Sequence, residues 1–202
     1  MRTDISVNRF GWLYRLDYKK LLIIVFLLRL ILASAYDILI TVTDNDFLLP
    51  DSKFYSVRGR YVDLVLQGYD KKSFSRDMLP SDRVGKEIFF NILRQEDGSL
   101  PSFKNQGNTY SFILGSLYYV FGYVTIWGRI FNIFLSIFSV YLLAWVARRY
   151  FGDVTANLFL LIALFLPTQF GYSIMLCRDF LRVFVVSVMI WIIYGGYAWA
   201  RK

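Results

Sequence analysis

Four long apolar runs alternate with polar segments along the chain. They are Leu21 to Ile40, Ile126 to Ala147, Val154 to Met175 and Phe180 to Trp199. Each is close to the roughly 20 residues that an α-helix needs to cross a bilayer. The pattern therefore predicts an all-α integral membrane protein with about four transmembrane helices.

The segment 41–125, between the first two runs, has amphipathic rather than uniformly apolar patterning. One predicted helix begins after Asp51, and a second covers about Arg83 to Gln95. Their apolar residues recur at helical spacing, as expected for surface helices with one buried face. In the first they are Phe54, Val57, Tyr61, Leu64 and Val65; in the second they are Val84, Ile88 and Ile92, with Phe89 one turn off.

A third stretch in this segment, Tyr110 to Val124, is apolar but short, and Gly115 and Gly122 interrupt it. A full crossing by this stretch would put Arg148 and Arg149 on the outer side of the membrane and break the charge bias described next. We therefore predict a juxtamembrane or partly inserted helix here.

Basic residues flank the apolar runs and predict their orientation. Five precede the first run, Arg148-Arg149 follow the second, and Arg201-Lys202 follow the fourth. Because basic residues concentrate on the cytoplasmic side, residues 1–20 are predicted to be cytoplasmic, and the loop 41–125 and the turn 176–179 external.

The first apolar run has a second interpretation, because Ala33-Ser34-Ala35 imitates a signal-peptidase site. Arg29 within the run and the long basic region before it favour an uncleaved anchor over a cleaved signal peptide. Either interpretation leaves the following loop outside.

Composition agrees with a membrane protein and excludes several chemistries. Hydrophobic residues make up 56% of the 202 residues, against roughly 45–50% in soluble domains. The loop from Thr41 to Asn108 holds ten basic and ten acidic residues, so the net charge of +8 comes from residues beside the apolar runs. This location of the excess charge argues against a nucleic-acid partner. The absence of histidine excludes a Ser-His-Asp triad and histidine metal sites, and the single Cys177 excludes an internal disulfide.

Several charged or kinking residues have structural interpretations. Asp51 fits the N-cap of the helix that follows it, and Arg178-Asp179 fits a plain turn between two spans. Arg29 would cost roughly 2.5–3.5 kcal/mol facing lipid, so we expect it to face protein or a water-filled groove. Asp37, two turns later on nearly the same face, is a candidate for the same polar seam, and Pro167 predicts a kink in the third run.

The order of several motifs resembles the N-terminal part of the GT-C glycosyltransferases, in the branch of protein mannosyltransferases and lipid A aminoarabinose transferases. They are PDSKFY at Pro50 to Tyr55, LYYVFG at Leu117 to Gly122, the run RIFNIFLSIFSVYLLAWVARRYFG from Arg129, and the Arg178-Asp179 turn. The resemblance implies transfer of a sugar from a polyprenyl-phosphate carrier to a hydroxyl of a glycan, lipid or protein acceptor. It also implies an external site on the bacterial inner membrane, although a relative in the endoplasmic reticulum would look similar.

The resemblance also assigns roles to residues. Asp51 matches the catalytic aspartate, and Asp179 matches the second acidic site in a later external turn. Lys104 and Arg178, together with Arg58, are candidates for binding the carrier phosphate. Ser52 stands where the family has a second acidic residue, which weakens the case for a divalent metal, and we assign no metal ligands and no other cofactor.

Length leaves alternatives open, because members of that family have seven or more spans. The chain is then expected to be a fragment of a longer enzyme, a truncated inactive product, or a subunit that pairs with another membrane chain. The alternative function is a non-catalytic membrane protein that binds or helps move lipid-linked sugars, or a subunit of a glycan assembly complex. A relative of O-antigen polymerases would keep the Arg-Asp turn and need no aspartate in the first loop.

Overall fold

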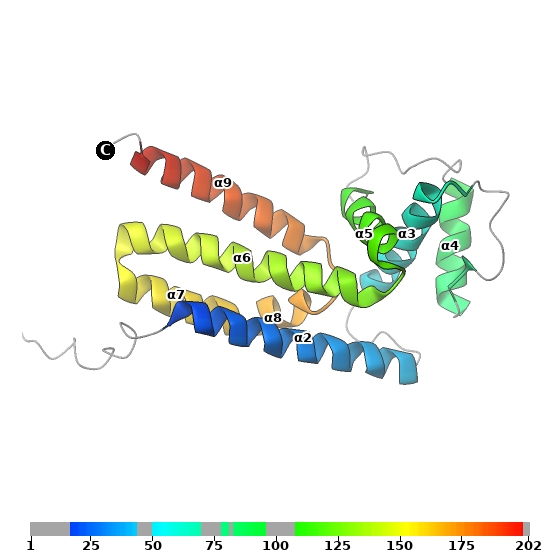
Figure 1. Ribbon diagram of the computed structural model, residues 1–202, viewed down its shortest axis with the longest axis horizontal. Coiled ribbons are helices and arrows are strands. Elements are labelled where there is room, and N and C mark those ends of the chain that lie inside the picture. Colours follow the sequence, from blue (N-terminus) through cyan, green and yellow to red (C-terminus); the bar gives the residue numbers. More distant parts are fainter. Residues whose placement is uncertain (1–16, 44–49, 70–77, 81–82, 96–107, 200–202) are drawn as a thin grey trace, which may run out of the picture. The chain divides into compact units, whose positions relative to one another are not determined.

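The computed structural model describes residues 17–43, 50–69, 78–80, 83–95 and 108–199, and all the regular structure in these ranges is helical (Figure 1). The helices are α2 (Tyr18–Thr43), α3 (Pro50–Leu66), α4 (Arg83–Gln95), α5 (Asn108–Phe121), α6 (Thr125–Phe151), α7 (Asp153–Phe165), α8 (Pro167–Ser173) and α9 (Asp179–Trp199). The prediction of an all-α protein is confirmed for this part of the chain.

Within the described ranges, two helices, α2 and α6, are long and apolar enough to cross a membrane. The pair α7 and α8 makes a third candidate if it counts as one span, with a bend of 55° between its halves. Pro167 lies at the bend, so the predicted kink is confirmed. Two to three candidate spans are consistent with a membrane protein, and a fourth span at α9 stays a prediction.

The helix ends differ from the sequence-based limits in understandable ways. Helix α3 begins at Pro50, so Asp51 lies in its first turn and the N-cap interpretation is wrong by position. Proline fits a first helical position, because its missing N–H would have no helical partner there. Helix α6 continues past the predicted span to Phe151, where Gly152 follows with φ 84° and ψ 174°, a backbone conformation that essentially only glycine adopts.

The described contacts divide the chain into two compact units. Unit 1 comprises residues Met1–Ile31, Ile133–Ser173 and Asp179–Lys202, and unit 2 comprises Leu32–Asn132 and Ile174–Arg178. The boundaries pass through α2 and α6, so both helices contribute to both units.

In unit 1 a core of apolar residues joins α2, α6 and α7 (Figure 1). Its buried members are Val25, Val140, Ala144, Leu160 and Leu164. Helix α9 joins α6 through aromatic pairs, since Phe138 lies 5.9 Å from Phe184 and Trp145 lies 6.1 Å from Trp191, measured between ring centroids.

In unit 2 the short helices α3, α4 and α5 pack together around α3 (Figure 1). The predicted face of α3 is confirmed at Val57, Tyr61 and Leu64, which are buried, and at Val65, which packs partly buried against them. Phe54 is half-buried.

The predicted face of α4 is confirmed at Phe89 and Ile92, which are buried, and at Ile88, which packs against the same cluster. The prediction is wrong for Val84, which is 53% exposed, and it missed the buried Leu93. The ring of Phe89 packs on Tyr61 of α3, with the ring centroids 6.3 Å apart.

Gly115 explains how closely α3 and α5 approach. A Cβ atom at this position would lie 2.4 Å from the Cβ of Val62 and 2.9 Å from the carbonyl oxygen of Gly59. The glycine that looks like an interruption in the apolar pattern is therefore a packing residue, and α5 remains a continuous helix through it.

Candidate functional site

The non-helical segment Ile174–Arg178 follows α8 in the chain and precedes α9. Its first four residues, 174–177, are buried. Buried backbone carbonyls outside a helix need donors from elsewhere, because an unpaired one costs about as much as a lost hydrogen bond. Two side chains of α6 supply these donors.

Asn132 binds two of the carbonyls. Its side-chain amide donates to the oxygen of Met175 at 2.6 Å and to that of Cys177 at 3.2 Å. Its own oxygen accepts a hydrogen bond from the hydroxyl of Tyr110 at 3.1 Å. A fully buried Asn132 thus joins α5, α6 and the segment.

Arg129, one turn earlier on α6, binds the third carbonyl and an acid. One guanidinium nitrogen donates to the oxygen of Ile174 at 2.8 Å, and the other lies 2.6 Å from a carboxylate oxygen of Asp37. The hydroxyl of Thr125 donates to the same carboxylate oxygen at 3.1 Å, and the ring of Tyr36 lies 4.7 Å from the guanidinium carbon. We call Arg129, Asn132, Asp37 and Tyr110 the α6 network.

Charge balance explains why the network tolerates a buried arginine. Arg129 is 2% exposed and Asp37 is 24% exposed, so each removes much of the cost of burying the other. Such ionisable residues near the ends of apolar helices are rare unless they have a structural or functional role.

Burial also fixes the protonation of the tyrosines on α5. It raises the pKa of Tyr110 well above its ordinary value near 10, and it raises the pKa of Tyr118 in the same direction. Tyr110 therefore remains a neutral hydroxyl and a hydrogen-bond donor to Asn132 at any physiological pH.

The predicted site residues of the first loop are placed only in part. Asp51 lies in the first turn of α3, where the helix dipole favours a carboxylate. The side chain of Asp51 lies outside the described part of the structure, as does the whole of Lys104. Ser52 is 2% exposed, so an acid at this position would be buried at a cost that a hydroxyl avoids. Arg58 is half-buried on α3, with its guanidinium 5.7 Å from the ring of Phe54.

The predicted residues of the later turn are neighbours in the chain. Arg178 is half-buried and ends the segment that the α6 network holds. Asp179 is the first residue of α9, and its carboxylate, 65% exposed, lies 3.4 Å from the guanidinium of Arg182. This is a solvent-screened pair, worth at most about 1 kcal/mol.

Sequence reasoning missed two polar groups in unit 2. Arg129 and Asn132 stand three residues apart in a predicted span. A charged or amide side chain in a span is costly unless it has partners, and this reason, which was applied to Arg29, would also have selected these two residues. Asp63 on α3 is fully buried between Arg60, at 2.5 Å, and Gln67, at 2.6 Å, a set that helical spacing alone could have suggested.

Arg29 belongs to unit 1, and the prediction that it faces protein is confirmed. Its guanidinium is fully buried and donates to the hydroxyl of Ser136 at 2.7 Å and to the carbonyl oxygen of Leu164 at 2.6 Å. Leu164 lies in the last turn of α7, before the break at Pro167. Arg29 therefore caps the negative end of a broken helix. Asp37, its predicted companion, is bound to Arg129 instead.

In the described part of the chain, no group of three or more His, Cys, Asp or Glu side chains is arranged to hold a metal ion. Comparisons with family models, curated proteins and solved structures found no significant match to this chain.

Proposed function

We propose that this chain is part of a membrane glycosyltransferase of the GT-C type. The observation that supports this best is the order of elements along the chain. A spanning helix, α2, is followed by three short helices, with Asp51 at the start of the first, and then by α6, the bent pair α7–α8, the Arg178-Asp179 turn and α9. This is the order that the resemblance leads us to expect.

The proposed topology has four spans: α2, α6, the pair α7–α8, and α9. The N-terminus is cytoplasmic, and the loop with α3, α4 and α5 and the turn at Arg178 are both external. The basic residues at the start of α2 and the end of α6 support this orientation in a bacterial inner membrane.

The proposed reaction moves a sugar from its polyprenyl phosphate to an acceptor hydroxyl. The acceptor oxygen attacks the anomeric carbon, the bond from this carbon to the phosphate oxygen breaks, and the hydroxyl proton passes to Asp51. General-base catalysis of this kind contributes about 10²–10⁴-fold. The location of Asp51 in the first turn of α3 is compatible with the role, because the helix N-terminus keeps the carboxylate ionised and therefore able to accept a proton.

The leaving polyprenyl phosphate gains negative charge, which a cation at the phosphate offsets. Arg178 is the candidate with the best structural support, with Arg58 and Lys104 as further candidates. The α6 network binds three carbonyls in the four residues before Arg178. A backbone fixed in this way loses little further freedom when its arginine binds a phosphate.

The alternative is a protein that binds lipid-linked sugar without transferring it. The 65% exposure of the Asp179 carboxylate favours this alternative for the later turn, because a catalytic acid usually lies in a site that excludes water.

A transfer assay on the longest gene product that contains this chain separates the two functions. It uses a radiolabelled polyprenyl-phosphate sugar, the native protein, and the variants Asp51→Asn and Asp153→Asn. Asp153 is the matched control, because it is also an aspartate in the first turn of a helix. Asp51→Asn should lower transfer by at least about 100-fold and leave the control unchanged. Full transfer by Asp51→Asn would remove the catalytic assignment, and retention of the lipid by a native protein that transfers nothing would favour the binding function.

A further inference from the structure

A narrow groove runs between α2 and α6 within unit 1. It has a volume of about 210 Å³ and is lined by Leu22, Phe26, Phe134, Ile137, Phe138 and Tyr141. The six side chains are all hydrophobic or aromatic. The groove therefore suits an apolar occupant.

The dimensions favour one hydrocarbon chain. The volume is below the roughly 300–1,000 Å³ of sites for drug-sized ligands. On α6 the lining runs from Phe134 to Tyr141, which at 1.5 Å per residue is about 10 Å along the helix axis. A short stretch of a lipid acyl chain fits such a shape.

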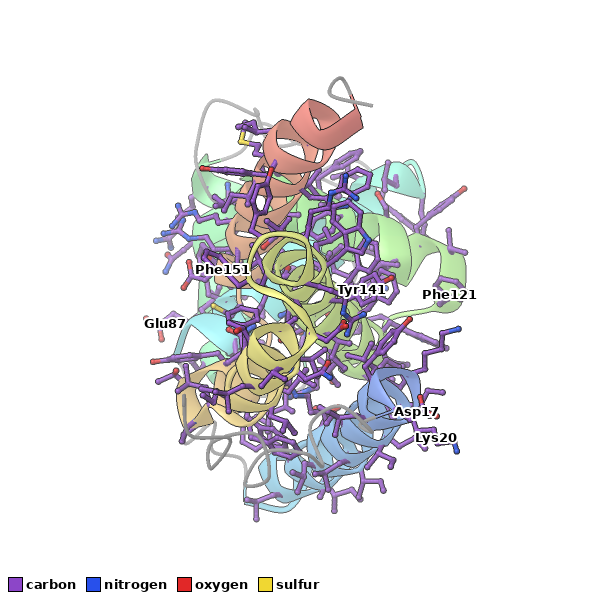
Figure 2. All side chains as sticks on the ribbon, turned by 90° about the vertical axis from the view of Figure 1, so that its left-hand side faces the viewer. Asp17, Lys20, Glu87, Phe121, Tyr141 and Phe151 are labelled. Carbon is purple, nitrogen blue, oxygen red and sulfur yellow. The ribbon has the colours of Figure 1, made fainter. Side chains whose placement is uncertain are left out.

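One end of the groove leads to a cationic surface. Tyr141 stacks on Tyr18 in the first turn of α2, with ring centroids 6.4 Å apart. The guanidinium of Arg148 lies 4.8 Å from the centre of the Tyr18 ring. The start of α2 and the end of α6 therefore meet at this end. Figure 2 looks onto it, with Lys20 pointing outward from α2.

Among the described residues at this end, two cations remain after the acids are counted. Lys20 lies 3.5 Å from Asp17, and Arg148 lies 2.9 Å from Asp153. Lys19 and Arg149, the chain neighbours of these two basic residues, are also exposed. The described residues at this end of unit 1 thus include more positive than negative side chains beside an apolar groove.

Within a bilayer the hydrocarbon of the groove cannot by itself select an occupant, because lipid tails are as apolar as the lining. Selection has to come from the charges at the end of the groove. We propose that unit 1 binds a phospholipid with an anionic headgroup, with part of one acyl chain in the groove and the phosphate at Lys19 and Arg149. This site is separate from the proposed transfer chemistry and does not depend on it.

Native mass spectrometry can test the site on the full chain purified in a neutral detergent. The protein is offered phosphatidylglycerol and phosphatidylcholine with identical acyl chains, and the ratio of the two bound lipids is measured. The test variant is Lys19→Gln/Arg149→Gln. The matched control is Lys86→Gln/Arg94→Gln, which removes two exposed charges from α4.

We expect the native chain and the control to prefer phosphatidylglycerol, and the test variant to lose about fivefold in preference for each charge removed. Glycerol phosphate without acyl chains should not displace the bound lipid. An unchanged preference in the test variant, an equal loss in the α4 control, or displacement by glycerol phosphate would each overturn the proposal. Circular dichroism checks that all variants keep their helix content.

Discussion

Replacing Arg129 by methionine tests the α6 network most sharply. The change leaves the carboxylate of Asp37 without its cation and the carbonyl of Ile174 without its donor. Removing one partner of a buried ion pair costs about 3–5 kcal/mol. Because Asp37 is 24% exposed and keeps the hydroxyl of Thr125, we expect a loss of unfolding free energy at the low end, about 3 kcal/mol.

A double-mutant cycle separates the ion pair from the carbonyl contact. In Arg129→Met/Asp37→Asn the uncompensated charge is gone, and only the orphaned carbonyl of Ile174 remains, at a cost of about 1–3 kcal/mol. The double variant should therefore be more stable than the sum of the two single variants predicts, with a coupling of about 1–2 kcal/mol.

The assay is unfolding in mixed micelles with increasing dodecyl sulfate, followed by the circular dichroism of the helices. The control cycle uses Arg148 and Asp153, whose pair is 33% and 62% exposed and should contribute less than about 1 kcal/mol. The reasoning is refuted if Arg129→Met costs no more than Arg148→Met, or if the two single effects at Arg129 and Asp37 simply add.

Three further predictions concern unit 2. Asn132→Leu leaves two buried carbonyls without their donor and should lower the unfolding free energy by about 2–4 kcal/mol in the same assay. Gly115→Ala should destabilise by about 1–3 kcal/mol through overpacking against α3, whereas Gly171→Ala, with no atom within 4 Å of the added Cβ, should be neutral or stabilising. Because burial raises the pKa of Tyr110 and Tyr118 above the unfolded value near 10, these two tyrosines should add no pH dependence to stability below pH 10 and should lower it above pH 10 by about 1.4 kcal/mol per pH unit for each tyrosine. Alkaline titrations of the two Tyr→Phe variants, with shallower slopes expected, check this.

The helices were predictable from sequence where one local signal decided them. Uniform hydrophobicity located α2 and α6, and Pro167 marked the bend between α7 and α8 because proline removes a helical hydrogen bond. The limits of α4 also followed from its pattern. Its buried face followed at Phe89 and Ile92. The burial of Leu93 and the exposure of Val84 did not follow, because they depend on how α4 packs on α3.

The α6 network could not have been derived from local patterns. Its contacts join residues far apart in sequence, such as Arg129 to Asp37 and Asn132 to Met175. The sequence does show that a guanidinium or an amide in an apolar helix needs partners, but it does not say which carbonyls will supply them. The role of Gly115 was hidden for the same reason, because only the neighbouring helix shows what its missing side chain makes room for.

The central proposal needs the loop with Asp51 and the turn with Asp179 on one side of the membrane. Cysteine accessibility measures this directly, in a background where Cys177 is replaced by serine. Lys86→Cys reports on the loop, Asp179→Cys on the turn, and Arg149→Cys on the opposite end of α6; all three native side chains are exposed. A membrane-impermeant maleimide should label the first two in intact cells and the third only after permeabilisation. Labelling of the loop and the turn from opposite sides would contradict a shared site for a lipid-linked sugar.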